Sequence, residues 1–346
     1  MTDPAQRFLM VRLSSIGDIV HALPAAAALA ETFPEAQIHW VVEKCYALLL
    51  EGNPHLHRIV ELDTLGWRRH LTWNATWREI SDGISDLRQT PYDAALDFQG
   101  LWKSAVVARL SRAHERIGFA ERWLREPSAG TLYTQRISPR EHVHVVEENL
   151  ALVARLGAHA QHWQFPLPWS DEDDAYVEAQ LTALGSEDFI IVNPGGGWRS
   201  KCWSPENYAA LVRQLAGMLP GQILLTGSPA EEPMIGEILQ NAGSERAHYF
   251  PSTLVQFIAL ARRARLFIGG DTGPLHLAAA VNTPIVGIYG PTDPVRNGPF
   301  AADDIALTNR GPINYTRRGE NPAYLPGISV ESVVAAVEER MARANE

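Results

Sequence analysis

The segment LFIGGDTGPLHLAAAVNTPIVGIYG, residues 266–290, is the part of this sequence that indicates its architecture most clearly. The apolar residues at its two ends have the pattern of short buried strands, and the alanine-rich run between them is typical of a helix. Pro274 fits the first turn of that helix, where a backbone N–H is not required. A strand, a helix and a strand in this order predict a unit of parallel sheet.

The same alternation continues in both directions from this segment. Further strand-like runs, each followed by a helical pattern, are FLMVRLSS (8–15), QIHWVVE (37–43), DAALDFQG (93–100), DFIIVNPG (188–195) and QILLTGS (222–228). Residues 158–174 interrupt the alternation, because they are rich in Pro, Trp and charge and show no period. We therefore predict an α/β protein of two doubly wound parallel-sheet domains, 1–170 and 171–346. Ligands are expected at the carboxyl ends of the strands, in a cleft between the domains.

The composition limits the class of protein. The chain has 346 residues, of which 46% are hydrophobic, so it is long enough for two cores and is not disordered. A net charge of −10 argues against a nucleic-acid-binding protein, which needs a basic surface. Cys45 and Cys202 form neither a disulfide framework nor a metal-binding pair. The sequence shows no signal peptide and no membrane-spanning run, which predicts a soluble cytoplasmic protein.

Residues 100–125 form a basic segment within this acidic chain. The segment contains six Lys or Arg residues and only two acidic residues. Such a run is either a solvated helix face or a cradle for an anionic partner. The sequence pattern alone leaves both interpretations open.

Small and polar residues follow the first predicted strand, in SSIGD (14–18). Ser14, Ser15 and Gly17 make a tight turn, and Asp18 lies where a helix begins. Asp18 is either a first-turn acid that stabilises the helix or a catalytic residue. The chain has no GxGxxG fingerprint and no Walker A motif, which disfavours a nicotinamide cofactor or a P-loop.

Two strand ends in the second half carry groups suited to a nucleotide. The glycines of NPGGG (193–197) allow close approach of a ligand, and Lys201 can supply a point charge to a phosphate. Glu231 and Glu232 lie at a helix start. A carboxylate there either accepts hydrogen bonds from ribose hydroxyls or interacts with the helix dipole.

The turn DTGPLH (271–276) predicts an anion site, because unpaired N–H groups and the positive end of a helix dipole point the same way. His276 is either a core histidine or a ligand of that anion. No metal site is expected, because the two closely spaced histidine pairs have no HExxH or Cys partners; these pairs are His55 with His57 and His142 with His144.

Two of these motifs together resemble the ADP-heptose:lipopolysaccharide heptosyltransferases, which are glycosyltransferases of GT-B architecture. They are SSIGDIVHALPA (14–25) and GGDTGPLHLAAA (269–280). Intermediate segments are similar to the branch that adds the first heptose, heptosyltransferase I. The similar segments are LDFQGLWKSA (96–105), RIGF (116–119), REPSAGTLY (125–133) and HVHVVEEN (142–149). The resemblance thus covers nearly the whole chain.

The resemblance implies an inverting, metal-independent transfer of L-glycero-D-manno-heptose from ADP-heptose to a Kdo residue of the lipopolysaccharide inner core, without a cofactor. Asp18 matches the family's general base. The implied donor-binding residues lie in the second domain: Lys201 to neutralise the diphosphate, Thr272 and Gly273 to bind it, His276 to assist, Asp271 to fix the turn or a donor hydroxyl, and Glu231 (or its neighbour Glu232) to contact the nucleoside.

The acceptor, Kdo-lipid A, is anionic, and the resemblance implies that the first domain receives it. The implied acceptor-binding residues are Arg12, Ser14, Ser15, Arg68, Arg69, Lys103, Arg116 and Arg125. Position 12 departs from the family, which often has Lys there. Trp67, Trp73 and Trp77 are candidates for an apolar rim at the inner membrane face. By analogy, the last helix, about 328–344, crosses back onto the first domain.

Two alternatives stay open beside this interpretation. One is another GT-B nucleotide-sugar enzyme, either a transferase similar to heptosyltransferase II or III or an epimerase, and an epimerase would not need the acceptor residues. The other is a non-catalytic nucleotide-binding protein, for which Asp18 would be dispensable.

Overall fold

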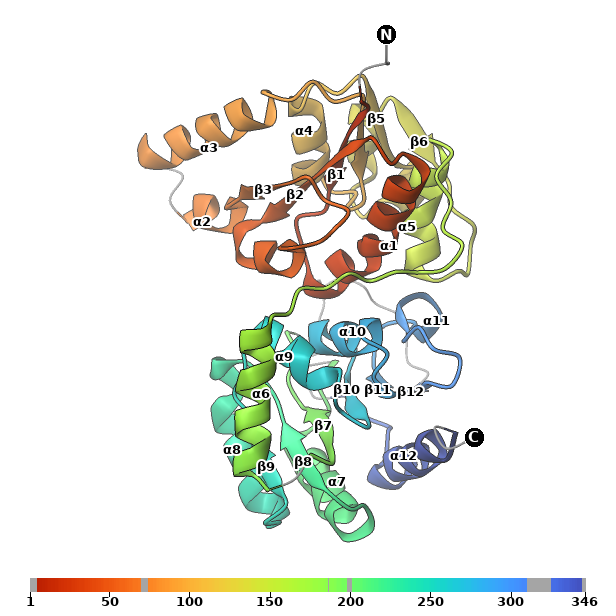
Figure 1. Cartoon of the computed structure of the whole chain (residues 1–346). Coiled ribbons are helices and arrows are strands. Elements are labelled where there is room, and N and C mark those ends of the chain that lie inside the picture. The colour runs from red at the N-terminus through yellow and green to blue at the C-terminus, as the bar shows by residue number, and fades with distance from the viewer. Residues whose placement is uncertain (1–4, 70–73, 186, 198–200, 310–324, 344–346) are drawn as a thin grey trace. The chain divides into compact units, whose positions relative to one another are not determined.

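The computed structural model describes residues 5–69, 74–185, 187–197, 201–309 and 325–343 (Figure 1). The chain divides into two compact units, Met1–Pro168 and Trp169–Glu346. Each unit contains one six-stranded sheet in which all the strand pairs are parallel. The predicted fold class, two doubly wound parallel-sheet domains, is confirmed.

The sheet of the first unit has the strand order β3-β2-β1-β4-β5-β6. Its strands are β1 (Arg7–Val11), β2 (Gln37–Glu43), β3 (Arg58–Leu62), β4 (Ala94–Asp97), β5 (Glu115–Phe119) and β6 (Gln135–Ile137). The central strands are apolar on both faces, as is usual for a sheet covered by helices on both sides. β1, for example, is buried from Phe8 to Val11.

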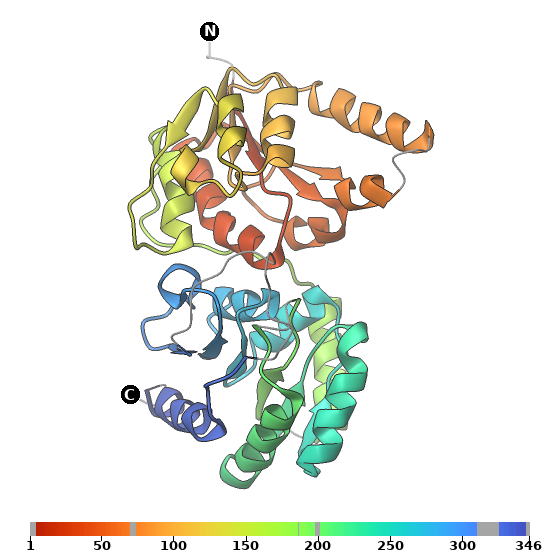
Figure 2. The same cartoon turned by 180° about the vertical axis from the view of Figure 1, so that it is seen from behind.

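Helices cover both faces of this first sheet (Figures 1 and 2). On one face α1 (Ile16–Thr32) packs against α5 (Val145–Ala154). The helices on the other face are α2 (Thr64–Arg69), α3 (Asn74–Leu87) and α4 (Trp102–Leu110). Three short 3₁₀ helices complete the unit: η1 (Lys44–Leu50), η2 (Glu121–Trp123) and η3 (Pro127–Leu132).

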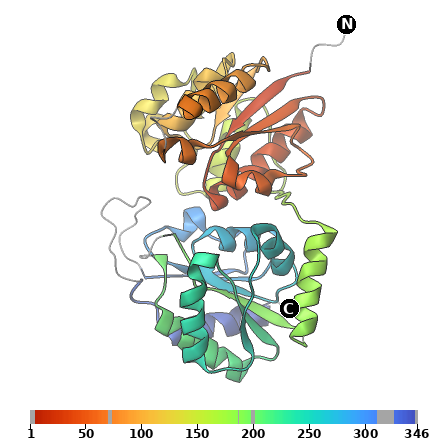
Figure 3. The same ribbon diagram turned by 90° about the vertical axis from the view of Figure 1, so that its left-hand side faces the viewer.

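The second unit repeats the same topology, with the order β12-β11-β10-β7-β8-β9. Its strands are β7 (Phe189–Asn193), β8 (Gln222–Leu225), β9 (Ala247–Tyr249), β10 (Phe267–Gly270), β11 (Ile285–Tyr289) and β12 (Ile305–Thr308). Its helices are α6 (Asp171–Ala183), α7 (Pro205–Met218), η5 (Pro229–Glu231), α8 (Glu232–Ala242), α9 (Leu254–Ala261), α10 (Gly273–Ala280), α11 (Pro294–Asn297) and α12 (Val330–Arg343). α6 and the α7–α8 pair lie on opposite faces of the sheet (Figure 3).

The last helix, α12, belongs to the core of the second unit. Its buried residues Val333 and Val337 join the apolar cluster formed by α7, α8 and the central strands. Arg340 reinforces this packing, since its Nε lies 2.9 Å from Oδ1 of Asp304 in the turn before β12. The apolar face of α12 is buried within the second unit, and contact of this helix with the first domain stays a prediction.

The strand order creates a topological switch point in each sheet. β1 lies between β2 and β4, and β7 lies between β8 and β10, so the connections from these central strands run to opposite sides. Ligands of open α/β sheets bind outside the carboxyl ends of the strands at such a point. In the first unit the loops there follow β1 and β4, and in the second they follow β7 and β10.

The basic segment 100–125 is not one helix face. It contains α4, strand β5 and the short helix η2. Its cations lie on these three elements and, for Arg112 and Arg125, in the turns that follow α4 and η2. The interpretation as a single solvated helix face was therefore wrong, because a buried strand interrupts the helical pattern.

In the part of the chain that the structure describes, none of the helices is long and apolar enough to cross a membrane.

Candidate active site

Asp18 lies just beyond the carboxyl end of β1, in the first turn of α1. Ser15 is the N-cap residue of α1, and its N–H and Oγ both donate hydrogen bonds to Oδ2 of Asp18, at 3.0 and 2.9 Å. The Asp18 side chain is nevertheless 41% exposed. Asp18 therefore stabilises the start of the helix and also presents a carboxylate to solvent, and its catalytic role stays a prediction.

Arg12 is the first residue after β1, and its side chain is only 10% exposed. One terminal nitrogen of its guanidinium donates to the carbonyl of Phe98, and the other pairs with Oδ1 of Asp18. The charge of Arg12 is therefore directed to Asp18. Contact of Arg12 with the acceptor stays a prediction.

Gln99 ties the loop after β4 to the loop after β1. Its Oε1 accepts a hydrogen bond from the N–H of Leu13 at 3.0 Å, and its Nε2 donates to Oγ of Ser14 at 3.3 Å. Ser14 thus has a partner on the neighbouring loop, and Ser15 has one in Asp18. The two serines position the first turn of α1, and contact with the acceptor stays a prediction for both.

A buried carboxylate, Asp97, organises the loop that carries Gln99. It accepts hydrogen bonds from the N–H groups of Gln99 (2.9 Å) and Gly100 (3.1 Å), from Ser104 Oγ (2.8 Å) and from the Tyr133 hydroxyl (2.7 Å). Burial raises the pKa of Asp97, although these hydrogen bonds oppose the shift. Asp97 was not among the residues predicted from the sequence. The feature that could have identified it is an acidic residue at the end of a strand, directly before a turn.

Three of the predicted acceptor-binding cations are found at or near the surface of the first unit. Arg68 on α2 and Arg125 before η3 are exposed. Lys103, at the start of α4, lies 3.5 Å from the buried carboxylate of Glu43 at the end of β2. Lys103 is therefore held at the carboxyl edge of the sheet, where a ligand of this fold is expected.

The Arg116 side chain donates hydrogen bonds to backbone carbonyls of the first unit. Its Nε donates to the carbonyl of Leu132 at 2.9 Å, and its Nη1 donates to the carbonyl of Ala113 at 3.2 Å. Ala113 precedes β5, so the guanidinium points toward the amino end of the strand. Burial and the charge of Arg109 lower the pKa of Arg116. Arg116 thus holds backbone segments together, and its contact with the acceptor stays a prediction.

The remaining first-unit predictions concern α2, α3 and the segment between them. Trp67 is half-buried, with its indole N–H 3.3 Å from Oε2 of Glu79, and Trp77 on α3 is exposed. The side chain of Arg69 and the whole of Trp73 lie outside the described residues. A lipid-facing role for these aromatic residues stays a prediction.

In the second unit, a buried charge cluster forms where β10 ends. Oδ2 of Asp271 lies 2.7 Å from Lys201 Nζ, and its Oδ1 lies 3.0 Å from His276 Nε2. Burial alone would raise the pKa of Asp271, but the hydrogen bond with His276 and the charge of Lys201 outweigh it and hold that pKa well below its usual value. The carboxylate is therefore ionised, and it orients both neighbours.

Thr272 and Gly273 form the start of α10, directly after Asp271. Thr272 is the N-cap residue, but its side chain makes no capping hydrogen bond. Its hydroxyl is buried, and no residue in the described part of the chain bonds to it. Because a buried hydroxyl without a partner is unfavourable, and the N-terminus of a helix attracts anions, this hydroxyl is suited to a bound oxyanion.

Glu231 has a structural role that the sequence did not reveal. Its Oε1 accepts a hydrogen bond from the N–H of Gly196 at 2.9 Å, and its Oε2 accepts from the N–H and Oγ of Ser228, at 2.7 and 2.8 Å. A side chain at Gly195 would collide with this carboxylate. Glu231 thus holds the glycine loop after β7 against the turn after β8, whereas Glu232 is exposed. Contact of either acid with a nucleoside stays a prediction.

Among the residues that the structure describes, no three His, Cys, Asp or Glu side chains come together as a metal site requires. The groups suited to binding are carboxylates, the ammonium groups of Lys103 and Lys201, hydroxyls and helix N-termini.

Comparison with known proteins gives a consistent result. The model of a family described as glycosyltransferase family 9 (heptosyltransferase) matches residues 83–322, well over half of the chain. Lipopolysaccharide heptosyltransferase 1 of Pseudomonas aeruginosa is 30% identical over 307 residues, which cover 87% of this chain and 83% of that protein. Lipopolysaccharide heptosyltransferase 3 of Escherichia coli K12 is 26% identical over 93% of this chain and 94% of its own length.

A solved structure, that of E. coli heptosyltransferase WaaC with ADP, has a TM-score of 0.75 at 26% identity. The similarity covers 97% of this chain and 100% of that structure. The resemblance to heptosyltransferases expected from the two sequence motifs is thereby confirmed.

Proposed function

We propose that this chain, which belongs to glycosyltransferase family 9, the heptosyltransferase family, transfers L-glycero-D-manno-heptose from ADP-heptose to a Kdo residue of the lipopolysaccharide inner core. We propose further that the transfer inverts the anomeric carbon and needs no metal ion. The observation that carries the proposal is the exposed carboxylate of Asp18, held rigidly at the switch point of the first sheet.

Asp18 has the properties of a general base for an attacking hydroxyl. In the proposed reaction it accepts the proton of a Kdo hydroxyl while that oxygen forms a bond to C1 of the heptose. The bond between C1 and the β-phosphate oxygen breaks, and its electron pair leaves with ADP. A well-positioned base contributes roughly 10²–10⁴-fold to such a step. Hydrogen bonds from Ser15 fix the position of the carboxylate, which matters for this step.

The second unit supplies groups that can stabilise the departing diphosphate. Lys201 is a cation held by Asp271, and the start of α10 offers the N–H of Gly273 and the buried hydroxyl of Thr272. Developing negative charge is stabilised best by donors that are already in position. The ADP named with the solved relative supports a nucleoside diphosphate as the leaving group. These groups are the basis for proposing that a metal ion is not required.

The identity of the acceptor is the finest part of the proposal. The similarity to lipopolysaccharide heptosyltransferase 1 favours the first heptose. The exposed cations Arg68 and Arg125, with half-buried Lys103, suit an anionic glycolipid. The similarity to heptosyltransferase 3 over most of the chain supports a second candidate, the addition of a later heptose to a core that already carries one.

A product assay tests these statements separately. The purified chain is given ADP-heptose in EDTA, with Kdo₂-lipid A or with Kdo₂-lipid A that already carries heptose, and products are identified by mass spectrometry and by the anomeric configuration in NMR. We expect product of inverted configuration from the first acceptor. Product from the heptosylated acceptor only would establish the second candidate, and activity that requires added Mg²⁺ would refute metal independence. Conversion of the sugar nucleotide without acceptor would indicate an epimerase.

A further inference from the structure

Arg12 occupies an unusual position for a charged residue. It directly follows the buried strand β1, and its side chain is 10% exposed. A buried cation is costly unless it is paired and hydrogen-bonded. Arg12 meets this condition through two nitrogens of one planar group, which bind the carbonyl of Phe98 and Oδ1 of Asp18. Its own carbonyl also accepts a hydrogen bond from the indole of Trp40, at 3.1 Å.

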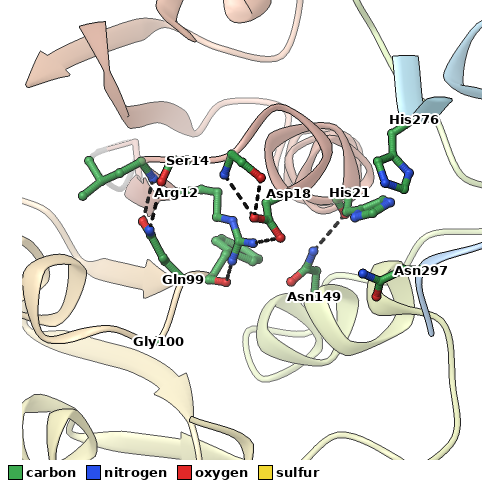
Figure 4. Close-up of polar contacts among 12 residues, drawn as sticks. Arg12, Ser14, Asp18, His21, Gln99, Gly100, Asn149, His276 and Asn297 are labelled. Atoms are coloured by element: carbon green, nitrogen blue, oxygen red, sulfur yellow. Dashed lines mark hydrogen bonds and ion pairs between the residues drawn. The ribbon is translucent and has the colours of Figure 1, made fainter. Parts of the chain in front are cut away.

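These contacts fix the guanidinium from both sides. Phe98 belongs to the loop after β4 and Asp18 to the first turn of α1, so Arg12 bridges the two loops at the switch point of the sheet. Oδ2 of Asp18 is held separately by Ser15. Both carboxylate oxygens therefore have donors, and the plane of the carboxylate is fixed (Figure 4).

We infer that Arg12 is a positioning residue for the transfer reaction, which sets the orientation of the Asp18 carboxylate and keeps it ionised. The inference rests on the proposed function, in which Asp18 is the base. It is an alternative to the role predicted for Arg12 from the sequence, which is contact with the acceptor. A guanidinium suits this task better than an ammonium, because its rigid fork can bind the Phe98 carbonyl and the carboxylate at once.

The charges around Asp18 support this role. An adjacent cation favours the ionised form of a carboxyl group and typically lowers its pKa by about 1–3 units. A second titratable group that acts on Asp18 electrostatically is Tyr46 of η1, whose pKa is raised by burial, by Cys45, by Glu43 and by Asp18. Tyr46 is therefore neutral over the pH range of an assay, whereas Arg12 places a positive charge directly against the Asp18 carboxylate.

The test compares Arg12→Gln and Arg12→Lys with a control, Arg58→Gln, which removes a cation paired with Asp86 on the half-exposed flank of the same sheet. For Arg12→Gln we expect kcat to fall about 10- to 100-fold through misplacement of the base. The acidic limb of the pH profile should move up by about 1 unit or more, with the acceptor KM changed less than kcat. Arg12→Lys should keep the acidic limb of the pH profile near its wild-type position. Arg58→Gln should change neither kcat nor the position of that limb.

A kinetic cycle and a direct titration complete the test. If Arg12 acts through Asp18, Arg12→Gln has no further effect in an Asp18→Asn background. The Asp18 carboxyl can also be titrated by ¹³C NMR in Asp-labelled protein, assigned by its disappearance in Asp18→Asn, and its midpoint should rise in Arg12→Gln. This readout does not depend on turnover, so it separates failure of this inference from failure of the proposed function.

Three results would overturn the inference. One is a raised acceptor KM in Arg12→Gln with kcat and the acidic limb unmoved, since that is the signature of acceptor binding. Another is a full additional loss of rate in the double variant. The third is an unchanged titration midpoint of Asp18. Should Arg12→Gln fail to fold, Arg12→Lys decides the question: a fall in kcat with an unmoved limb supports positioning, and wild-type kcat contradicts it.

Discussion

Replacing Asp271 by Asn is expected to destabilise the second unit by about 3 kcal/mol at pH 7, because it removes the negative charge between Lys201 and His276. Asp271 is 4% exposed, and its two oxygens lie 2.7 Å from Lys201 Nζ and 3.0 Å from His276 Nε2. Removing one partner of a buried pair costs about 3–5 kcal/mol, since the other charge loses its compensation. The Lys201 side chain keeps 16% exposure, so we take the lower end of that range.

The effect should depend on pH in a defined direction. The pKa of Asp271 in the folded state is well below its ordinary value. Its contribution to stability is therefore complete above the pKa of the unfolded chain, about 4, and is lost as the pH falls toward the folded-state value. The difference in stability between the wild type and Asp271→Asn should stay constant from about pH 7 to 5 and narrow below about pH 4.

Thermal and urea unfolding measure this prediction. A loss of about 3 kcal/mol corresponds to a fall of roughly 6–12 °C in the unfolding midpoint of a unit of this size. The control is Asp188→Asn, which breaks the pair of Asp188 with Arg265, whose side chains are 40% and 42% exposed. Exposed pairs contribute only about 0–1 kcal/mol. A free energy of unfolding that falls no more in Asp271→Asn than in this control would show that the buried charge cluster does not stabilise the unit.

Three further substitutions test individual contacts. Thr272→Val removes a buried hydroxyl without a partner among the described residues, so the free energy of unfolding should change by less than about 1 kcal/mol. ADP affinity, measured by calorimetry, should nevertheless fall about 10-fold. Glu231→Ala should lower unfolding stability by about 1–3 kcal/mol through loss of three hydrogen bonds, and Glu232→Ala should leave it unchanged; equal effects would contradict the loop contact. Tyr133→Phe removes a hydrogen-bond donor to buried Asp97, so the free energy of unfolding, measured with urea, should fall by about 1–3 kcal/mol. An unaltered urea midpoint would argue against a stabilising role for this hydrogen bond.

Much of the fold was predictable because strands buried on both faces leave a strong apolar signal. β2 was predicted at its observed bounds, residues 37–43, and the unit from β10 to β11 followed from its apolar ends and the alanine-rich helix. β5, β6, β9 and β12 were missed. β6, β9 and β12 are short strands at the edges of the two sheets, and β5 begins with two charged residues. The periodicity of apolar residues therefore does not distinguish these strands from loops.

The candidate site was predicted less completely than the fold. Strand-end position identified Asp18 and Asp271, because carboxyl ends of parallel strands are where ligands of this architecture bind. Which atoms meet there depends on side-chain conformations set by tertiary packing. That is why the pairing of Arg12 with Asp18, the backbone contacts of Arg116 and the loop contacts of Glu231 could not be inferred from residue type and spacing.

The role of Asp18 as the base is tested by the single-turnover rate of Asp18→Asn with ADP-heptose and Kdo₂-lipid A in EDTA, with ADP affinity determined on the same preparation. We expect the rate to fall roughly 10²–10⁴-fold while ADP binding is unchanged, because only the base is removed. A rate near that of the wild type, from a variant that binds ADP normally, would contradict the assignment of Asp18 as the base.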